Sequence, residues 1–365
     1  MGRLASGKVT TETSIEGYLR ECRQLTLDEL TRHLPRDTRY TAGLYDIMLD
    51  YPMRPAKALR PALCMGACLA LGGNLDAALP SAAAFELFHN ALLVHDDVED
   101  GSLLRRHGPT LHTTYGVPIA VNVGDGMLAI ALEPLLDNVR VLGLGPALRI
   151  LHLIKRMARE SVEGQMLELD WIRRRRWDVR DHEYLRMVHK KTGWYSFISP
   201  VQVGAIAAGA PRETVDALGR FALGLGIAFQ IQDDLLSLEG TEAAIGKDAL
   251  GDLWEGKYTL PLLHTLRSVT PDEQREALEI LARPRAARDA GGDAAELEER
   301  EREVLRLHAL VVGRGGASVA HARDVANRFA RRAQRVLDGA LGSLPSSVHK
   351  GFLRSLVDFV IHRSR

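Results

Sequence analysis

Two short segments of the sequence gather aspartates in a pattern that suits a hard divalent cation. The segment HDDVED carries Asp96, Asp97 and Asp100, and the segment IQDDLLS carries Asp233 and Asp234. On an α-helix Asp96 and Asp100 lie one turn apart on one face, so their carboxylates repel each other unless a cation joins them. No cluster of His or Cys ligands accompanies either segment. The pattern therefore favours Mg²⁺, held by carboxylates and phosphate oxygens, over Zn²⁺.

Cationic side chains accompany the acidic segments. They are Lys57 and Arg60 in AKALRP, Arg105 and Arg106 in RRHGP, Lys191 in HKKTGWY, and Lys247 and Lys257 in GKDALGDLWEGK. Each one alone is best explained as a surface residue, but together they supply the point charges and guanidinium forks that two polyphosphates need. Four glycines between residues 240 and 257 favour a lid that closes over such a site, although an ordinary mobile loop explains them as well.

Composition excludes several classes of function. The 365 residues are 46% hydrophobic, and 47 Lys and Arg balance 47 Asp and Glu, so no overall field attracts nucleic acid or an anionic membrane. Three cysteines, Cys22, Cys64 and Cys68, are too few for a disulfide framework and indicate reduced thiols. We see no secretory signal and no uncharged apolar run of about 18 residues. We therefore expect a cytoplasmic protein without a stable membrane anchor.

Helical periodicity predicts the elements that position these residues. Apolar residues recur at three- and four-residue spacing over 59–73, 79–97, 148–169 and 322–341, which are rich in Ala and Leu. The segment VPIAVNV (117–123) is the nearest to a strand, but its pattern continues with helical spacing, so we expect a buried helix. The sequence thus predicts an all-α fold, built as a single large helical bundle.

Several breaks interrupt these helices, but none is long enough to be an interdomain linker. They fall at 72–73, 142–147, around Pro211, at 240–257 and at 283–303, the last of which we interpret as an exposed connection between helices. Four consecutive arginines at 173–176 are typical of a solvated loop. We therefore expect one domain over 1–365.

A weak internal echo links the two acidic segments. LVHDDVED recurs as FQIQDDLLS, and each aspartate doublet follows an apolar helical run. Two helices of one bundle can bring both doublets to the mouth of a shared cavity.

The ordered motifs resemble those of the trans-isoprenyl diphosphate synthases, the polyprenyl synthetase family. The likeness runs from about residue 53 to the C-terminus, which leaves 1–52 as an N-terminal helical extension. The matching motifs are AKALRP, FELFHNALLVHDD, DDxxD followed by RRHGP, GDGMLA, EGQMLEL, KTGWY, FQIQDD and GKDALGDLWEGKYTLP. So many motifs in the family's order make the match specific.

The resemblance implies a fold with a central cavity, a homodimer, and three Mg²⁺ ions per active site. It implies that isopentenyl diphosphate condenses with an allylic diphosphate after the allylic C–O bond ionises. By carry-over, Mg²⁺ is bound by Asp96, Asp97, Asp100 and Asp233, with Asp234 in the second doublet; the allylic diphosphate by Arg105, Lys191, Gln230, Lys247 and Lys257; and isopentenyl diphosphate by Lys57, Arg60, His89 and Arg106. Lys191 and Thr192 are implied to steady the carbocation.

Chain length follows, in this family, from the side chains beneath the first acidic motif. Ala91 and Leu92, five and four positions before Asp96, are not aromatic, so the growing tail should pass the level at which farnesyl products stop. Phe88 lies eight positions before Asp96 and therefore roughly 12 Å deeper than Asp96, at about 1.5 Å per residue. We expect Phe88 to help form the floor and the product to be geranylgeranyl diphosphate (C20), with farnesyl or longer products as the alternative.

The sequence departs from the family pattern at three places. Three rival functions also remain as alternatives. Ser237 replaces an aspartate that is common at the end of the second motif, Ala56 and Ala58 replace Gly and Arg, and Glu168 replaces Asp. A class I terpene cyclase shares the aspartate motif but does not explain a second set of phosphate-binding cations. An HD-type phosphohydrolase needs further histidines in register, and a catalytically silent partner subunit should have lost an aspartate set.

Overall fold

The computed structural model describes residues 14–35, 41–239, 250–283 and 294–362. Over these ranges the chain is almost entirely helical, which confirms the predicted all-α class. The helices are α1 (Ile15–His33), α2 (Ala42–Met53), α3 (Leu59–Ala70), α4 (Leu75–Asp100), α5 (Leu111–Tyr115), α6 (Val117–Ile130), α7 (Leu132–Leu142), α8 (Leu144–Arg174), α9 (Asp181–Val188), the π-helix η1 (His189–Ile198), α10 (Ser199–Ala207), α11 (Arg212–Glu239), α13 (Gly251–Glu255), α14 (Leu260–Ser268), α15 (Pro271–Ala282), α16 (Ala294–Val312), the 3₁₀ turn η2 (Arg314–Gly316), α17 (Ala317–Leu341) and α18 (Val348–His362). One two-stranded hairpin, β1 (Leu104–Arg105) with β2 (Gly108–Pro109), interrupts them.

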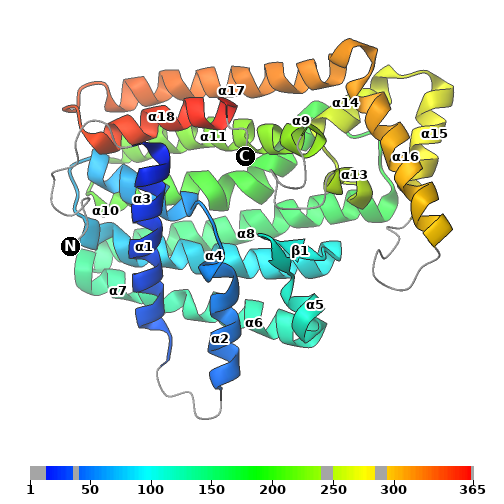
Figure 1. Ribbon diagram of the computed structural model, residues 1–365. Helices are drawn as coiled ribbons and strands as arrows, with labels where there is room; N and C mark the ends of the chain where they lie inside the picture. Colours follow the sequence, from blue (N-terminus) through cyan, green and yellow to red (C-terminus); the bar gives the residue numbers. More distant parts are fainter. Residues whose placement is uncertain (1–13, 36–40, 240–249, 284–293, 363–365) are drawn as a thin grey trace.

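Long helices stack around the middle of the molecule. In Figure 1 α17 and α18 lie above α11, α4 and α8 run through the centre, α6 and α7 lie below them, and α2 extends furthest down. α11 packs along α17, and α4 packs against both α3 and α6. A single large apolar cluster joins most of these helices, so the core is shared across the bundle.

The two helices that carry the acidic doublets belong to this core. Asn74 caps α4, its side chain accepting a hydrogen bond from the Ala77 N–H at 2.9 Å, and Gly101 ends α4 with a left-handed φ of 62°. By length and composition, α4, α11 and the segment Val117–Leu142 are apolar enough to cross a membrane. In α4 and α11, however, 72% and 61% of the apolar window is buried inside the protein. Both are core helices whose apolar faces already have partners.

The structure corrects two expectations about local order. The segment 117–123 is helical as expected, but it is not fully buried, because Val117, Ile119 and Val121 are 49%, 46% and 38% exposed. The predicted connection over 283–303 is wrong from residue 294 onward, where α16 begins. The Ala, Glu, Leu and Arg residues of α16 are strong helix formers. The two glycines before them favour a loop, and the prediction extended this loop too far along the chain. All three cysteines are buried free thiols.

Candidate active site

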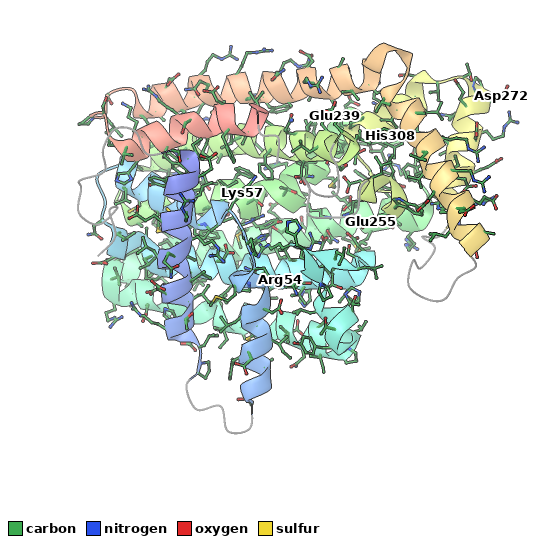
Figure 2. The ribbon with its side chains drawn as sticks, in the orientation of Figure 1. Arg54, Lys57, Glu239, Glu255, Asp272 and His308 are labelled. Carbon is green, nitrogen blue, oxygen red and sulfur yellow. The ribbon has the colours of Figure 1, made fainter. Side chains whose placement is uncertain are left out.

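A cavity of about 530 Å³ opens between α3, α4, η1 and α11. Most of the residues predicted to bind substrate or metal lie on its wall. They are Lys57, Arg60, His89, Asp96, Arg105, Arg106, Lys191, Thr192, Gln230, Asp233, Asp234 and Lys257. In Figure 2 Lys57 stands on the connection before α3 and Glu255 on α13, further along the bundle. The two aspartate segments, 137 positions apart in the chain, therefore meet at one cavity.

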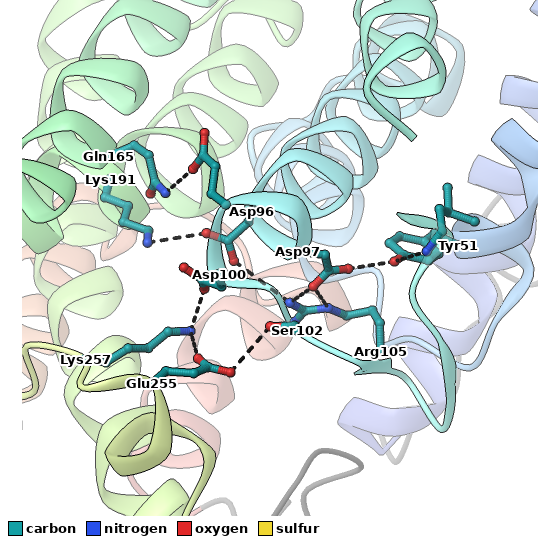
Figure 3. A network of polar contacts seen from close by, with 12 residues as sticks. Tyr51, Asp96, Asp97, Asp100, Ser102, Arg105, Gln165, Lys191, Glu255 and Lys257 are labelled. Atoms are coloured by element: carbon teal, nitrogen blue, oxygen red, sulfur yellow. Dashed lines mark hydrogen bonds and ion pairs between the residues drawn. The ribbon is translucent and has the colours of Figure 1, made fainter. Parts of the chain in front are cut away.

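Two lysines reach across the cavity to the first acidic segment (Figure 3). The Lys191 ammonium lies 3.5 Å from Asp96 Oδ1, and the Lys257 ammonium lies 3.0 Å from Asp100 Oδ2. Glu255 holds Lys257 from the other side at 2.9 Å. Burial raises the pKa of Asp100 to about 6, although Lys257 opposes this shift. The carboxylates of Asp96 and Asp100 thus stabilise positive charge placed beside them.

Asp97 was predicted to bind a metal, which stays a prediction; in the structure its carboxylate already has protein partners. Its side chain is 1% exposed, and both of its oxygens are occupied. Oδ1 accepts hydrogen bonds from two guanidinium nitrogens of Arg105, Nε at 2.8 Å and Nη2, while Oδ2 accepts one from the Tyr51 hydroxyl at 2.6 Å. Asp97 is not on the cavity wall, because it lies about 100° around the helix from Asp96. The Asp97 carboxylate holds the Arg105 guanidinium in place through these hydrogen bonds.

The two aspartates of the second doublet, Asp233 and Asp234, also differ in their surroundings. Asp234 is buried, and its oxygens accept hydrogen bonds from the Tyr184 hydroxyl at 2.6 Å, the Gln230 amide at 3.0 Å and the Leu260 N–H at 3.3 Å. Burial, with Asp252 nearby, raises the pKa of Asp234 to about 8. Both Asp233 and Asp234 line the cavity, and the hydrogen bonds of Asp234 also tie α11 to its neighbours.

Ser237, the departure at the end of this motif, is turned back onto its own helix. Its hydroxyl donates to the Asp234 carbonyl at 3.0 Å. Serines within helices often form such hydrogen bonds to a carbonyl of the preceding turn. This bond turns the Ser237 hydroxyl away from a position in which it could bind a metal.

The π-helix η1 positions Lys191 and Thr192. π-Helical turns are rare and occur mostly at functional sites. Here η1 lies against α8 at Gly164, where a Cβ atom would be 2.2 Å from the Lys191 backbone nitrogen, so only glycine allows this approach. The Lys191 ammonium lies 2.5 Å from Glu168, whose longer side chain spans the gap to η1. Thr192 donates to the Gln230 side chain at 2.9 Å, which links η1 to α11.

A second group of cations lines the other end of the cavity. Arg60 donates to the Ser196 hydroxyl at 2.7 Å and lies over the Tyr195 ring at 4.6 Å. Arg106 lies 3.3 Å from His89 Nε2. Because a guanidinium carries only donors, Nε2 must accept, and the neutral imidazole then bears its proton on Nδ1. Burial, together with Arg60 and Arg106, lowers the pKa of His89 well below 6.5, which agrees with the neutral form.

Unpartnered polar atoms mark this end of the cavity as a binding surface. Among the described residues, Arg60 Nε, His89 Nδ1 and Glu86 Oε2 are buried without a hydrogen-bond partner. Buried polar groups without partners are rare in folded proteins, since each loses its hydration without compensation. Two of the three are donors that an anion would satisfy.

The residues predicted to set chain length are not on the described cavity wall. Ala91 is fully buried among Met48, Val94 and Ala120, so it faces α2 and α6. Phe88 packs against an apolar cluster that includes Leu27 and Leu30 of α1. Leu92 is also absent from the wall, which on α4 is made by Glu86, His89, Leu93 and Asp96. The predicted role of these three positions stays a prediction. Lys247 lies outside the described residues.

Sequence reasoning missed the residues that hold the site's cations and acids in place. Tyr51 and Arg54 belong to α2 and its end, within or next to the segment treated as an extension, and Tyr184 belongs to α9. None of them is part of a charged motif. Only the buried position of Tyr51 and Tyr184, which a single sequence does not reveal, marks their hydroxyls as needing partners.

The fold and the cavity bring two acidic segments and two groups of cations together at one site of a helical protein. The family model for polyprenyl synthetases matches residues 42–296. The chain belongs to the polyprenyl synthetase family and is a trans-prenyltransferase.

The similar proteins include synthases named for different products. The chain is 33% identical over 341 residues to a geranylgeranyl diphosphate synthase of Methanosarcina mazei, covering 92% of this chain and 93% of the relative. It is 40% identical over 210 residues to a (2E,6E)-farnesyl diphosphate synthase of Mycobacterium tuberculosis, covering 58% and 56%. A solved polyprenyl synthase of Caulobacter crescentus, complexed with calcium and isoprenyl diphosphate, superposes with a TM-score of 0.79 at 28% identity, covering 97% and 99%.

Proposed function

We propose that the protein is a Mg²⁺-dependent geranylgeranyl diphosphate synthase, which adds isopentenyl diphosphate to allylic diphosphates until the product reaches C20. One observation carries the proposal. Asp96 of α4 and Asp233 of α11 line the same cavity as two separate groups of cations. A condensation of two diphosphates needs this arrangement, since one diphosphate must ionise while the other stays bound.

The donor set fits Mg²⁺. Within the described ranges, no three His, Cys, Asp or Glu side chains already converge as metal ligands. Mg²⁺ does not require that, because it usually binds through one or two protein carboxylates and completes its shell with water and substrate phosphates. Asp96, Asp100 and Asp233 are the carboxylates that we assign to it, for up to three ions. Bound Mg²⁺ would stabilise the charge that develops on the departing allylic diphosphate.

The chain's own residues supply the remaining steps. Arg105, Lys191 and Lys257 hold the allylic diphosphate and stabilise its growing charge as the C–O bond breaks. The neutral His89 and the guanidinium groups of Arg60 and Arg106 hold isopentenyl diphosphate, whose double bond attacks the allylic cation. Thr192, fixed by Gln230, steadies the cation. After the new C–C bond forms, the isopentenyl unit loses a proton from C2 as its new double bond forms, and the freed diphosphate takes up this proton. Buried apolar walls keep water away from the cation.

The C20 product is tested by mass analysis of the products made from dimethylallyl and isopentenyl diphosphates with Mg²⁺. We expect C20 as the main product, and we expect Phe88→Ala to shift the distribution to longer chains because the ring no longer closes the space below α4. Leu25→Ala, which trims another partly buried apolar side chain of the core, serves as the control and should leave the product length unchanged. Wild-type products that stop at C15 or pass C30 would refute the C20 assignment, and an unchanged length would clear Phe88 of its role.

A terpene cyclase is the second candidate, but one feature of the cavity argues against it. A cyclase binds a single prenyl diphosphate. It would leave the buried donors Arg60 Nε and His89 Nδ1 without a function.

We also propose that the protein forms a homodimer through α6, α7 and α8. These consecutive helices expose a large set of apolar side chains. It comprises Val117, Ile119, Val121, Leu132, Leu136, Val139, Val141, Leu144, Leu148, Leu151, Val162 and Met166. A patch of this extent is unusual on a monomer, and the family resemblance makes a second copy the natural occupant.

Charged substitutions on this surface should separate the dimer. Leu136 and Val162 are each 62% exposed, so the double variant Leu136→Glu, Val162→Glu should fold but lose association. Sedimentation velocity should then give the mass of one 40.2 kDa chain, while the wild type gives twice that mass. Leu305→Glu on α16, where Leu305 is 57% exposed, is the matched control and should remain dimeric. A wild type that sediments as a monomer would contradict the proposal.

A further inference from the structure

The short hairpin between α4 and α5 carries two arginines of the active site in a strained turn. Residues 104–105 pair with residues 108–109, and the two residues at the tip, Arg106 and His107, have φ values of 51° and 63°. A two-residue hairpin turn needs positive φ at both positions, which favours Asn and Gly. Arg and His adopt this conformation only where the surroundings hold it. The direction of Arg105 and Arg106 therefore depends on what the hairpin contacts.

Tyr51 of α2 is linked to both arginines, to Arg106 directly and to Arg105 through Asp97; Figure 3 shows the link through Asp97. Its backbone carbonyl accepts a hydrogen bond from Arg106 Nη1 at 2.6 Å. Its hydroxyl donates to Asp97 at 2.6 Å, and Asp97 in turn accepts two hydrogen bonds from Arg105. The same hydroxyl accepts the N–H of Leu111, the residue that begins the helix after the hairpin.

The residue that makes these contacts lies in the core and on a helix whose end is held by hydrogen bonds. Tyr51 is fully buried. The end of α2 is held by Arg23, which donates to the carbonyls of Pro52, Met53 and Arg54 at 3.1 Å each. Arg54 then donates to the carbonyls of Arg105 and Pro109, at 2.7 and 2.8 Å, on the two strands of the hairpin. The backbone of the hairpin is thus held by the end of α2, while its arginine side chains line the cavity.

We propose that Tyr51 is the positioning residue of the active site, and that its hydroxyl sets Arg105 for the allylic diphosphate by acting through Asp97. Tyr51 is not on the cavity wall, so we expect it to act on the substrates only through other residues. Its carbonyl gives Arg106 a separate anchor, which no side-chain substitution removes. The proposal rests on the assignment of Arg105 to the allylic diphosphate and of Arg106 to isopentenyl diphosphate.

The Tyr51→Phe variant isolates the hydroxyl because it keeps the buried ring. We expect the KM for the allylic diphosphate to rise about tenfold, the effect of losing one hydrogen bond to a charged group. The KM for isopentenyl diphosphate should change less than about twofold, since the Tyr51 carbonyl still holds Arg106. Tyr45→Phe, on the same helix, is the matched control and should change neither value. Equal rises in both KM values, or a lower melting temperature with both KM values intact, would reduce Tyr51 to a structural residue and overturn the proposal.

A double-mutant cycle tests whether Tyr51 acts through Arg105. In an Arg105→Lys background, Tyr51→Phe should raise the allylic KM by no more than about twofold, because the group it orients is gone. Additive effects would overturn the proposal. Asp97→Asn, which keeps the side-chain shape, should reproduce the rise in allylic KM. If it instead raises only the Mg²⁺ concentration needed for half activity, Asp97 is a metal ligand and the proposal is wrong.

A measurement without turnover separates this proposal from the proposed function. Calorimetry with Mg²⁺ and inorganic diphosphate should show binding about tenfold weaker for Tyr51→Phe than for the wild type or Tyr45→Phe. This difference is expected even if the wild type makes no prenyl product, in which case only the proposed function fails. Equal affinities in all three proteins would overturn the positioning role.

Discussion

Asp233→Asn and Asp96→Asn are each expected to lower kcat by about 10³-fold, because each removes a carboxylate that we assign to Mg²⁺ while keeping the size of the side chain. Metal ions supply several kcal/mol of transition-state stabilisation, and about 4 kcal/mol corresponds to about 10³ in rate. The two aspartates stand on different helices, α4 and α11, yet line one cavity. Their removal should therefore have the same kind of effect.

The measurement is the steady-state rate over a range of Mg²⁺ concentrations. Both variants should need more Mg²⁺ for half activity as well as turning over more slowly. Asp216→Asn is the matched control on α11, since Asp216 is exposed and pairs with Arg212 on the same turn. It should keep the wild-type rate. If either variant retains more than about a tenth of the wild-type kcat with unchanged Mg²⁺ dependence, the metal assignment for that residue is wrong.

The sequence predicts the convergence of these aspartates because their motifs carry both charge and helical spacing. Asp96 and Asp233 follow long apolar runs, and a helical bundle brings such ends together. The sequence does not distinguish Asp96 from Asp97, since both are aspartates in one motif. The structure separates them, because a step of about 100° around α4 turns Asp97 away from the cavity toward Tyr51.

The role of Tyr51, the start of α16 and the burial of 117–123 could not be predicted from the sequence, because each depends on contacts or on competing local signals. Tyr51 acts through a partner 46 residues away, and its segment shows no charge or glycine pattern. The start of α16 at residue 294 was hidden by the glycines before it, although its Glu, Leu and Arg residues favour a helix. Helical spacing placed 117–123 in a helix, but the degree of burial depends on which neighbours cover it, and three of its side chains remain exposed.

Arg106→Lys is expected to raise the KM for isopentenyl diphosphate by about 30- to 100-fold, with a change of less than about threefold for the allylic diphosphate. Arg106 Nη1 donates to the Tyr51 carbonyl and to the Asn90 side chain at 3.2 Å, and Nη2 lies 3.3 Å from His89. A lysine ammonium cannot make these contacts and also present a planar fork to a phosphate. A hydrogen bond to a charged group contributes about 1.5–3 kcal/mol, which corresponds to about 13- to 160-fold in affinity, and the expected rise lies within these limits.

Initial rates with each substrate varied in turn measure the two KM values. Arg328→Lys on α17, where the arginine is exposed and pairs with Asp324, is the matched control. The outcome also distinguishes the two enzyme classes that fit the aspartate motif. A terpene cyclase binds one diphosphate, so Arg106 would affect that single substrate or nothing. A selective loss of isopentenyl diphosphate binding is expected only if the wall formed by Arg60, His89 and Arg106 holds a second diphosphate while the first ionises beside Asp96 and Asp233.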